Sequence, residues 1–448
     1  MCSEISGGII MKKTTIIITL ILLMGLFGCA NDSTKYEPLK ADEDVTIIVS
    51  TDMHFLASDY HDDGASSQQL YRLRDGKLTK YGTEILHAFI DEVIEKKPTA
   101  LVLTGDLTFN GEMASHKEIA VALKEVKKAG INVFVSPGNH DIRNPFAYSF
   151  KGDDVFQEQT VEADEFKKIY QDFGWNQAIM QDEKSLSYLV ELREGLWLLM
   201  MDANKYMFNS GFGTVAIGSF QTETIEWMKE CFELAKEKGA KIITSTHQSL
   251  LINEYLHSDD YRITNSNALK NLMAQYGSKV NLSGHIHTQA IVSNEHLDAT
   301  LYEVVTESLA VAQNNYGFIT ITPDDVFTYE AVSLGVEGWA KKNGITDENL
   351  LNFSEYGLKF YQDVSYTNFY NRYEGYGMTP QEAEILAKFV SDLNPYYFSG
   401  RIEEFREEAL NSAAYKLALK YKDEYNMNYV ISMLRQRKLD QRKLSIQL

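Results

Sequence analysis

Five short blocks of polar residues in this sequence follow apolar runs that have the character of β-strands. In an α/β protein the carboxyl ends of the strands present the functional side chains, so residues in these positions are candidates for chemistry. Five of the ten histidines fall within the blocks. The blocks are Asp52-Met53-His54, Gly105-Asp106, Gly138-Asn139-His140-Asp141, Thr246-His247 and Gly284-His285-Ile286-His287.

Carboxylate, amide and imidazole groups without thiolates are a ligand set that suits manganese, iron or zinc. Each block alone has a simpler interpretation: Gly105-Asp106 fits a turn, Pro137-Gly138-Asn139 fits a tight turn, and His247 fits a buried core position. The alternation in Gly284-His285-Ile286-His287 is more specific, because an extended chain places both imidazoles on one side. Five such blocks in succession, each ending a strand, predict a metal site whose glycines let the backbone turn sharply.

Together the blocks resemble the signature of the calcineurin-like metallophosphoesterases, D-x-H, G-D, G-N-H-D, H and G-H-x-H, over residues 45–332. The resemblance implies two mixed sheets flanked by helices, and two metal ions. One ion would be held by Asp52, His54, Asp106 and His287, and the other by Asp106, Asn139, His247 and His285. A shared Asp106 is reasonable because two cations ~3.5–4 Å apart need an anion between them. Manganese is the favoured metal, with iron or zinc as alternatives.

Such cations would acidify a trapped water and stabilise charge on phosphoryl oxygens, so the resemblance implies attack by a metal-bridging hydroxide on a phosphoester. His140 is left over as a ligand and is the candidate general acid, oriented by Asp141, for a poor leaving group such as a sugar alkoxide. A structural role beside the metals is the alternative for His140. Asn110, which follows Asp106 closely, is a candidate substrate contact or part of a surface turn.

An alternation of strands and helices must position these side chains. Apolar, strand-like runs lie at 45–49, 100–103, 133–135, 196–201, 241–244 and 280–282. Helical patterns lie between them at about 81–96, 112–129, 221–238 and 266–276. With the family resemblance, this predicts an α/β (α+β) fold in which two mixed sheets form a four-layer αββα sandwich with helices. A further, mostly antiparallel part is predicted from the later strands at 301–305, 317–322 and 326–332.

Helical periodicity replaces strands after about residue 338, which predicts a catalytic domain over 45–337 and an all-α C-terminal domain over 338–448. Thr379-Pro380-Gln381-Glu382 has the pattern of an N-cap, a proline at the first helical position and a capping-box glutamate. Tyrosines and phenylalanines are frequent between residues 361 and 397. They are expected to pack helices together, with stacking on a nucleobase as the alternative.

Residues 1–29 have the layout of a secretory signal, with Met11-Lys12-Lys13 before an apolar run that ends near Cys29. That run is short of the ~20 apolar residues that span a bilayer. Leu26-Phe27-Gly28-Cys29 resembles the lipobox of bacterial lipoproteins, which implies lipidation of Cys29 and an extracytoplasmic protein tethered to the cell membrane. A cleaved signal without lipid, or an uncleaved anchor, is the alternative. Translation is expected to start at Met11, and residues 30–44 are expected to form a linker.

The net charge of −20, from 43 basic and 63 acidic residues, argues against binding to long nucleic acids. Protein phosphatases of this superfamily carry G-D-x-V-D-R-G and a glutamate at the end of the third motif. The segment 105–111 and Asp141 depart from that pattern. The whole plan resembles Gram-positive lipoprotein cyclic-nucleotide phosphodiesterases. We therefore favour nucleoside cyclic phosphates as substrates over glycerophosphodiesters or nucleotide monoesters. The alternative to an enzyme is a surface binding lipoprotein whose metals are only structural.

Overall fold

The computed structural model of the protein describes residues 36–72, 75–251, 259–374 and 376–448. The signal segment and Cys29 therefore lie outside the described residues, and so do residues 30–35 of the predicted linker. Within the described ranges, no helix combines the length and apolar character needed to cross a membrane. Residues Pro38–Leu448 form one compact unit.

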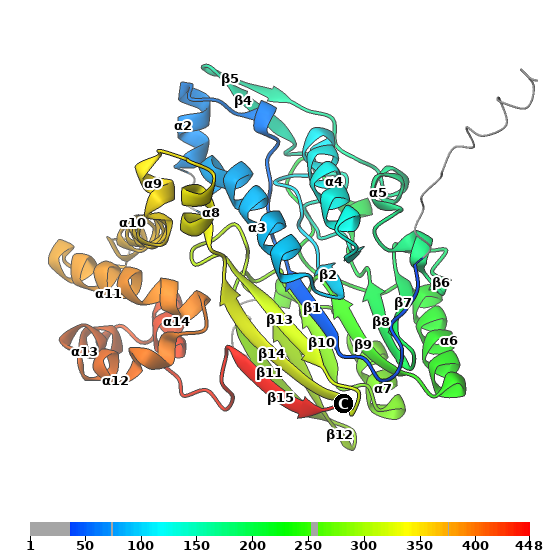
Figure 1. Ribbon diagram of the computed structural model, residues 1–448. Helices are drawn as coiled ribbons and strands as arrows, with labels where there is room; N and C mark the ends of the chain where they lie inside the picture. The colour runs from blue at the N-terminus through cyan, green and yellow to red at the C-terminus, as the bar shows by residue number, and fades with distance from the viewer. Residues whose placement is uncertain (1–35, 73–74, 252–258, 375) are drawn as a thin grey trace, which may run out of the picture. The chain divides into compact units, whose positions relative to one another are not determined.

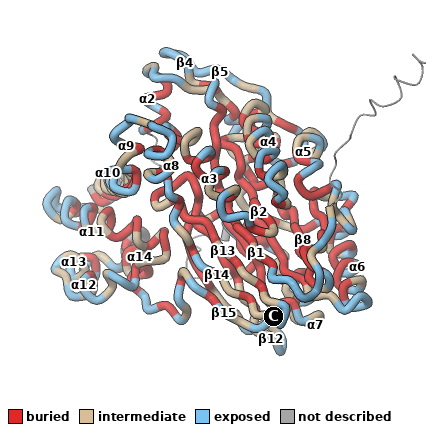
Figure 2. Tube along the Cα trace, in the orientation of Figure 1, coloured by how far each residue is buried: buried red, intermediate tan, exposed pale blue. Residues whose placement is uncertain are grey.

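Two large mixed sheets form the centre of this unit (Figure 1). The first has six strands in the order β15-β14-β13-β1-β2-β3. Its members are β1 (Val45–Ser50), β2 (Ala100–Leu103), β3 (Asn132–Val135), β13 (Asn315–Ile321), β14 (Val326–Ser333) and β15 (Lys443–Gln447). Strands β1, β2 and β3 are parallel, so their carboxyl ends reach the same edge. These three strands are almost wholly apolar because both faces of the sheet are covered (Figure 2).

The second sheet has seven strands in the order β11-β12-β10-β9-β8-β7-β6. Its members are β6 (Met180–Gln181), β7 (Tyr188–Arg193), β8 (Leu196–Met201), β9 (Lys241–Thr246), β10 (Val280–Ser283), β11 (Ala290–His296) and β12 (Ala299–Val305). Strands β8, β9, β10 and β12 run parallel. A separate hairpin is formed by β4 (Tyr148–Lys151) and β5 (Asp154–Gln157).

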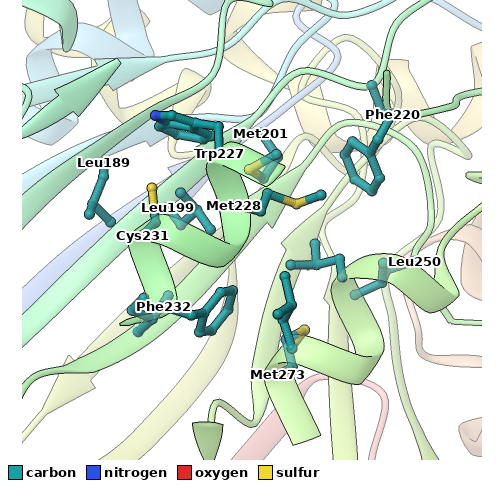
Figure 3. Packing of buried hydrophobic residues seen from close by; sticks show 14 of the residues in the cluster. Leu189, Leu199, Met201, Phe220, Trp227, Met228, Cys231, Phe232, Leu250 and Met273 are labelled. Atoms are coloured by element: carbon teal, nitrogen blue, oxygen red, sulfur yellow. The ribbon is translucent and has the colours of Figure 1, made fainter. Parts of the chain in front are cut away.

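Helices flank both sheets, which confirms the predicted mixed α/β architecture. Those of the catalytic part are α2 (Ala65–Tyr71), α3 (Gly82–Lys96), α4 (Met113–Lys128), α5 (Ala163–Tyr170), α6 (Thr222–Lys238) and α7 (Asn267–Tyr276). One buried cluster joins α6 and α7 to the second sheet, and its members include Trp227 and Cys231 of α6, Leu199 of β8 and Met273 of α7 (Figure 3). Cys231 is fully buried and behaves as a small hydrophobic residue of the helix.

The prediction of a mostly antiparallel part holds for β13 and β14, which pair antiparallel, but the later strands do not all belong to one sheet. β13 and β14 extend the first sheet, whereas β12 joins the second sheet parallel to β10. The hydrophobic pattern identifies the strands but not their partners. The exposed edges of β1 and β10 would present unpaired backbone groups, and these later strands cover both edges.

The C-terminal region is helical, as predicted, except at its end. Its helices are α8 (Val336–Lys342), α9 (Glu348–Leu351), α10 (Phe353–Glu374), α11 (Pro380–Phe398), α12 (Arg406–Asn411), α13 (Ala413–Lys420) and α14 (Tyr425–Met433). The capping box of Thr379 and Glu382 starts α11 as the sequence indicates. The final residues, included in the predicted helical domain, instead form β15, which pairs antiparallel with β14.

The aromatic residues of this region mainly pack its helices. Tyr373 and Tyr397 are fully or almost fully buried, and Phe369 lies against Tyr429 with a ring-centroid distance of 5.7 Å. The same cluster includes Ala290 of β11. The helical region is thereby attached to the edge of the second sheet, and these rings are not available to a nucleobase.

Candidate metal centre

The five polar blocks predicted from the sequence meet where strands of both sheets end. The first three blocks follow β1, β2 and β3, and the last two follow β9 and β10. Two groups of side chains are found here, and within each group the ligand atoms all lie within 4.8 Å of one another. The first group is Asp52, His54 and His287, and the second is Asp106, His247 and His285. All these residues except half-buried His287 are buried.

The first group directs two imidazole nitrogens and a carboxylate oxygen to one point. His54 Nε2 lies 3.0 Å from His287 Nε2, and Asp52 Oδ1 lies 3.2 Å from the latter. The other oxygen of Asp52 accepts hydrogen bonds from the Thr51 hydroxyl at 2.7 Å and from the His285 amide at 2.8 Å. These bonds fix the carboxylate so that Oδ1 is the oxygen available to a cation.

In the second group, His247 follows β9 of the second sheet and is held by Thr104, which follows β2 of the first sheet. His247 Nδ1 donates to the Thr104 carbonyl at 2.9 Å, which directs Nε2 inward. His247 Nε2 then lies 3.3 Å from Asp106 Oδ2 and 3.3 Å from Asn139 Oδ1. The amide oxygen of Asn139 thus joins this group, in agreement with the ligand set that the resemblance implies.

Asp106 lies between the two groups. Its Oδ2 atom is 3.3 Å from His247 Nε2 and 3.8 Å from His54 Nε2, so one oxygen faces both. Its Oδ1 atom accepts a hydrogen bond from the His140 amide at 2.8 Å. One oxygen of Asp106 therefore faces the ligand atoms of both groups, a position compatible with a carboxylate shared by two cations.

The chemistry of these side chains fits two metal ions. Neither ring nitrogen of buried His285 has a hydrogen-bond partner among the described residues, and burial lowers its pKa to about 3, so the imidazole is neutral. Burial alone would raise the pKa of Asp106, but His247 and His140 outweigh it and hold the pKa well below its usual value. For His247 the directions are reversed: burial would lower its pKa, but the nearby Asp106 carboxylate raises it to about 9. The negative charge of Asp106 thus favours a cation at the point where these donor atoms meet.

The backbone at the metal centre is strained in a way that the sequence did not indicate. Positive φ angles are uncommon for residues other than glycine and cost ~1–3 kcal/mol each. Five of the candidate ligands adopt them: Asp52 (50°), His54 (42°), Asp106 (49°), His285 (69°) and His287 (55°). Strain concentrated on the residues that share one site indicates that their side-chain positions are what this part of the fold maintains.

The glycines of the blocks matter mainly because nothing larger fits. The expectation of a sharp backbone turn is met at Gly105, whose φ is 107°, but Gly138 and Gly284 do not have positive φ angles. At Gly138 a Cβ atom would collide with the Asp106 carboxylate, and at Gly284 it would collide with Thr51 and Asp52. Both glycines therefore let the backbone approach a ligand closely.

We expect Gly138→Ala to weaken metal binding by ~10–100-fold, because Asp106 must move to make room for the methyl group. Metal content after dialysis against graded chelator would measure this loss. Gly338→Ala is the matched control, since a Cβ atom there meets open space. Equal metal retention by both variants would contradict the close approach.

His140 is positioned by residues other than the predicted one. Its Nδ1 atom lies 3.1 Å from the Phe109 carbonyl oxygen and 3.0 Å from Asn110 Oδ1, and its ring centroid lies 4.9 Å from that of His54. Asn110, predicted as a substrate contact or a turn residue, thus helps to orient the imidazole. Its Oδ1 atom also accepts a hydrogen bond from the Asn144 side-chain amide at 3.1 Å. With Nδ1 engaged, Nε2 is the nitrogen that can exchange a proton with a bound molecule.

The prediction that Asp141 orients His140 is wrong. The Asp141 carboxylate accepts hydrogen bonds from the amides of Leu107, Thr108 and Gly138 and from the Thr108 hydroxyl, at 2.8–3.1 Å. Burial and the nearby Asp106 raise its pKa to about 7. Asp141 therefore fastens the loop after β2 to the loop after β3, and adjacent residues of an irregular loop need not point their side chains toward each other.

His116 of α4 supports the same loop, because its Nε2 donates to the Asp141 carbonyl at 2.8 Å. Burial lowers the pKa of His116 to about 4, against about 6.5 in an unfolded chain. Between these values the unfolded state binds more protons, so the free energy of unfolding falls as the pH falls. Between pH 7 and pH 5, the His116→Gln protein is expected to lose about 2 kcal/mol less of its free energy of unfolding than the wild type loses. Urea unfolding of metal-free protein at both pH values tests this, and an unchanged pH dependence would contradict it.

Several partners of the ligands were not predicted. Thr51 and Thr104, which hold Asp52 and His247, directly precede ligand blocks, so their position was an available signal. Two further partners lie far from the blocks in sequence. The Ser308 hydroxyl donates to the Asp52 backbone carbonyl at 2.7 Å, and the Thr214 hydroxyl accepts a hydrogen bond from the Asn139 side-chain amide at 3.3 Å. Only the tertiary structure brings them to the site.

Two family models match the sequence. Residues 45–289 match the model described as calcineurin-like phosphoesterase, and residues 335–440 match the C-terminal domain of cyclic nucleotide phosphodiesterase. The comparison with curated protein sequences finds no match.

The solved structures that this chain resembles are distant in sequence. A dimetal phosphatase from Danio rerio is 10% identical, with 66% of this chain and 97% of that chain covered and a TM-score of 0.43. A purple acid phosphatase from yellow lupin (Lupinus luteus) is 12% identical, with coverages of 66% and 52% and a TM-score of 0.44. The Haemophilus influenzae NAD nucleotidase is 12% identical, with coverages of 65% and 50% and a TM-score of 0.35.

Proposed function

Because this chain belongs to the calcineurin-like phosphoesterase family, and is therefore a metal-dependent phosphoester hydrolase, we propose that its substrate is a nucleoside cyclic phosphate. The observation that carries the substrate class is the match of residues 335–440 to the C-terminal domain of cyclic nucleotide phosphodiesterase. The net charge of −20 supports a small substrate held at the metal centre over a long polyanion.

We propose that the two ligand groups, with Asn139, hold two ions, of which manganese is the first candidate. Bound ions supply positive charge at the phosphoryl group and an activated water as the nucleophile. Asp106, whose Oδ2 faces both groups, would be the ligand shared by the two ions, and its Oδ1 accepts a hydrogen bond from the His140 amide, which fixes the loop that carries the proposed acid. The buried ligands exclude bulk water from the reacting group, which strengthens each of these electrostatic interactions.

In this mechanism His140 donates the proton that the leaving oxygen needs. The Phe109 carbonyl and Asn110 hold Nδ1, so the proton leaves from Nε2 as the bond from phosphorus to the sugar oxygen breaks. Burial lowers the pKa of His140, although Asp106 acts in the opposite direction, and an imidazolium with a lowered pKa is a stronger acid. A ribose alkoxide is a strong base, so this assistance matters most for alkyl phosphodiesters.

A substrate panel with Mn²⁺ tests the proposal. It comprises 2′,3′- and 3′,5′-cyclic nucleotides, glycerophosphodiesters, mononucleotides and bis-nitrophenyl phosphate. The highest kcat/KM is expected for a cyclic nucleotide. Preference for a glycerophosphodiester or a mononucleotide would replace the proposed substrate, and inactivity on the whole panel with any divalent metal would favour a binding protein with structural metals.

We also propose that the mature protein is lipid-anchored through Cys29 on the outer side of the cell membrane. The support is the lipobox-like segment ending at Cys29 behind a signal-like apolar run. The full-length protein expressed in a Gram-positive host is expected to partition into the detergent phase, whereas Cys29→Ala should enter the aqueous phase or the medium. Identical partitioning of the two proteins would contradict lipidation at this residue.

A further inference from the structure

Tyr261 is a partly exposed aromatic residue in direct contact with the metal centre. Its ring centroid lies 5.4 Å from that of His285, a candidate ligand, and the two rings are inclined at 54°. The residue nevertheless remains 41% exposed to solvent. The contact with His285 therefore uses only part of the tyrosine, and neither ligand group uses the rest of its surface.

Three rings form a series from the interior of the site toward solvent. The ring centroids of His247 and His285 lie 4.8 Å apart, and Tyr261 follows on His285. Exposure rises along the series, from 0% for His247 through 7% for His285 to 41% for Tyr261. Tyr261 therefore lies on the solvent side of the second ligand group. A phosphoester bound at the buried ligands has to extend its other parts toward solvent, because the interior is filled.

The backbone holds Tyr261 in this position from two sides. Arg262, the next residue, forms a β-bridge with Ser249, which lies two residues after His247. The carbonyl of Arg262 accepts a hydrogen bond from the Gly218 amide at 2.9 Å. The backbone beside the tyrosine is thus fixed before a ligand binds, which lowers the entropy cost of using its ring as a contact.

We propose that Tyr261 binds the nucleobase of a nucleoside phosphate by stacking, while the phosphoryl group lies at the metal centre. The inference rests on the proposed function and adds to it a residue that recognises the base. An aromatic ring suits this role because every base has a π-face and stacking needs no fixed pattern of hydrogen bonds. A nucleobase is also uncharged, so the net charge of −20 does not repel it.

Three variants separate stacking on a base from support of the metal site. Tyr261→Phe keeps the aromatic ring, whereas Tyr261→Leu replaces it with an aliphatic side chain that can still cover His285. Phe156→Leu is the matched control, because Phe156 is an exposed aromatic residue of β5 and belongs to neither ligand group. Each protein is loaded with Mn²⁺, and its metal content and unfolding temperature are compared with those of the wild type.

Calorimetric titration with a nucleoside 5′-monophosphate and with ribose 5-phosphate is the first readout, and KM and kcat for a cyclic nucleotide are the second. Tyr261→Leu is expected to weaken binding of the nucleotide by ~10-fold or more, the factor that stacking on one base provides. KM should rise by a similar factor with little change in kcat. Binding of ribose 5-phosphate and the metal content should stay unchanged. Tyr261→Phe and Phe156→Leu should bind both ligands as the wild type does.

Equal affinity of Tyr261→Leu and the wild type for the nucleotide would overturn the inference. Equal losses for the nucleotide and ribose 5-phosphate would also overturn it, because they would leave Tyr261 as a support of His285. A wild type that binds the nucleotide no more tightly than ribose 5-phosphate would show that there is no base site. Failure of the proposed function is a different result, in which the wild type binds the nucleotide through Tyr261 yet hydrolyses no cyclic nucleotide.

Discussion

Asp106→Asn is expected to remove stable binding of both metal ions and to lower kcat/KM for phosphodiesters by ~10³-fold or more. The expectation follows from the position of Asp106 Oδ2, which lies 3.3 Å from His247 Nε2 and 3.8 Å from His54 Nε2. Asparagine has nearly the same shape and can still accept the hydrogen bond from the His140 amide, so the loop after β3 should keep its position. What is lost is the negative charge that two neighbouring cations need between them.

Metal analysis by mass spectrometry after gel filtration measures the first effect, and steady-state kinetics with bis-nitrophenyl phosphate measures the second. Asp154→Asn is the control, because Asp154 is exposed on β5, away from the ligand groups. An Asp106→Asn protein that retains two equivalents of metal would contradict the bridging role. Retention of one equivalent would show that Asp106 serves a single ion.

His140→Ala is expected to lower kcat by ~10²–10⁴-fold for cyclic nucleotides and other alkyl phosphodiesters. The loss for nitrophenyl esters should be much smaller, because nitrophenolate departs without a proton whereas a ribose alkoxide does not. The geometry supports this separation, since Nδ1 is engaged by Phe109 and Asn110, and the imidazole is not a member of either ligand group. Both metal ions should therefore remain bound.

Rates on a series of esters with leaving groups of graded basicity measure this effect as a slope. His87→Ala is the control, since His87 is an exposed residue of α3. A steeper dependence on leaving-group basicity is expected in His140→Ala alone. Equal losses on alkyl and aryl esters would remove the assignment as general acid and leave a role in shaping the site.

Much of the sheet and helix pattern was predictable because local physics determines it. The run Ala100–Leu103 is apolar throughout and Val45–Ser50 is mostly apolar, as is typical of strands covered on both faces. The Thr379 capping box fixed the start of α11 from four adjacent residues. The pairing partners of β12, β13 and β15 depend instead on residues that are distant along the chain, so no local pattern indicated them.

The sequence by itself determined which side chains gather at the metal centre, because a strand end is a local feature and parallel strands bring their ends together. It did not determine what each side chain contacts there. Asp141 binds backbone amides instead of His140, and Thr214 and Ser308 contact ligand residues from segments with no motif. Five candidate ligands adopt left-handed backbone angles. Loop direction, burial and strain are set by the packing of the two sheets, and only the tertiary structure decides them.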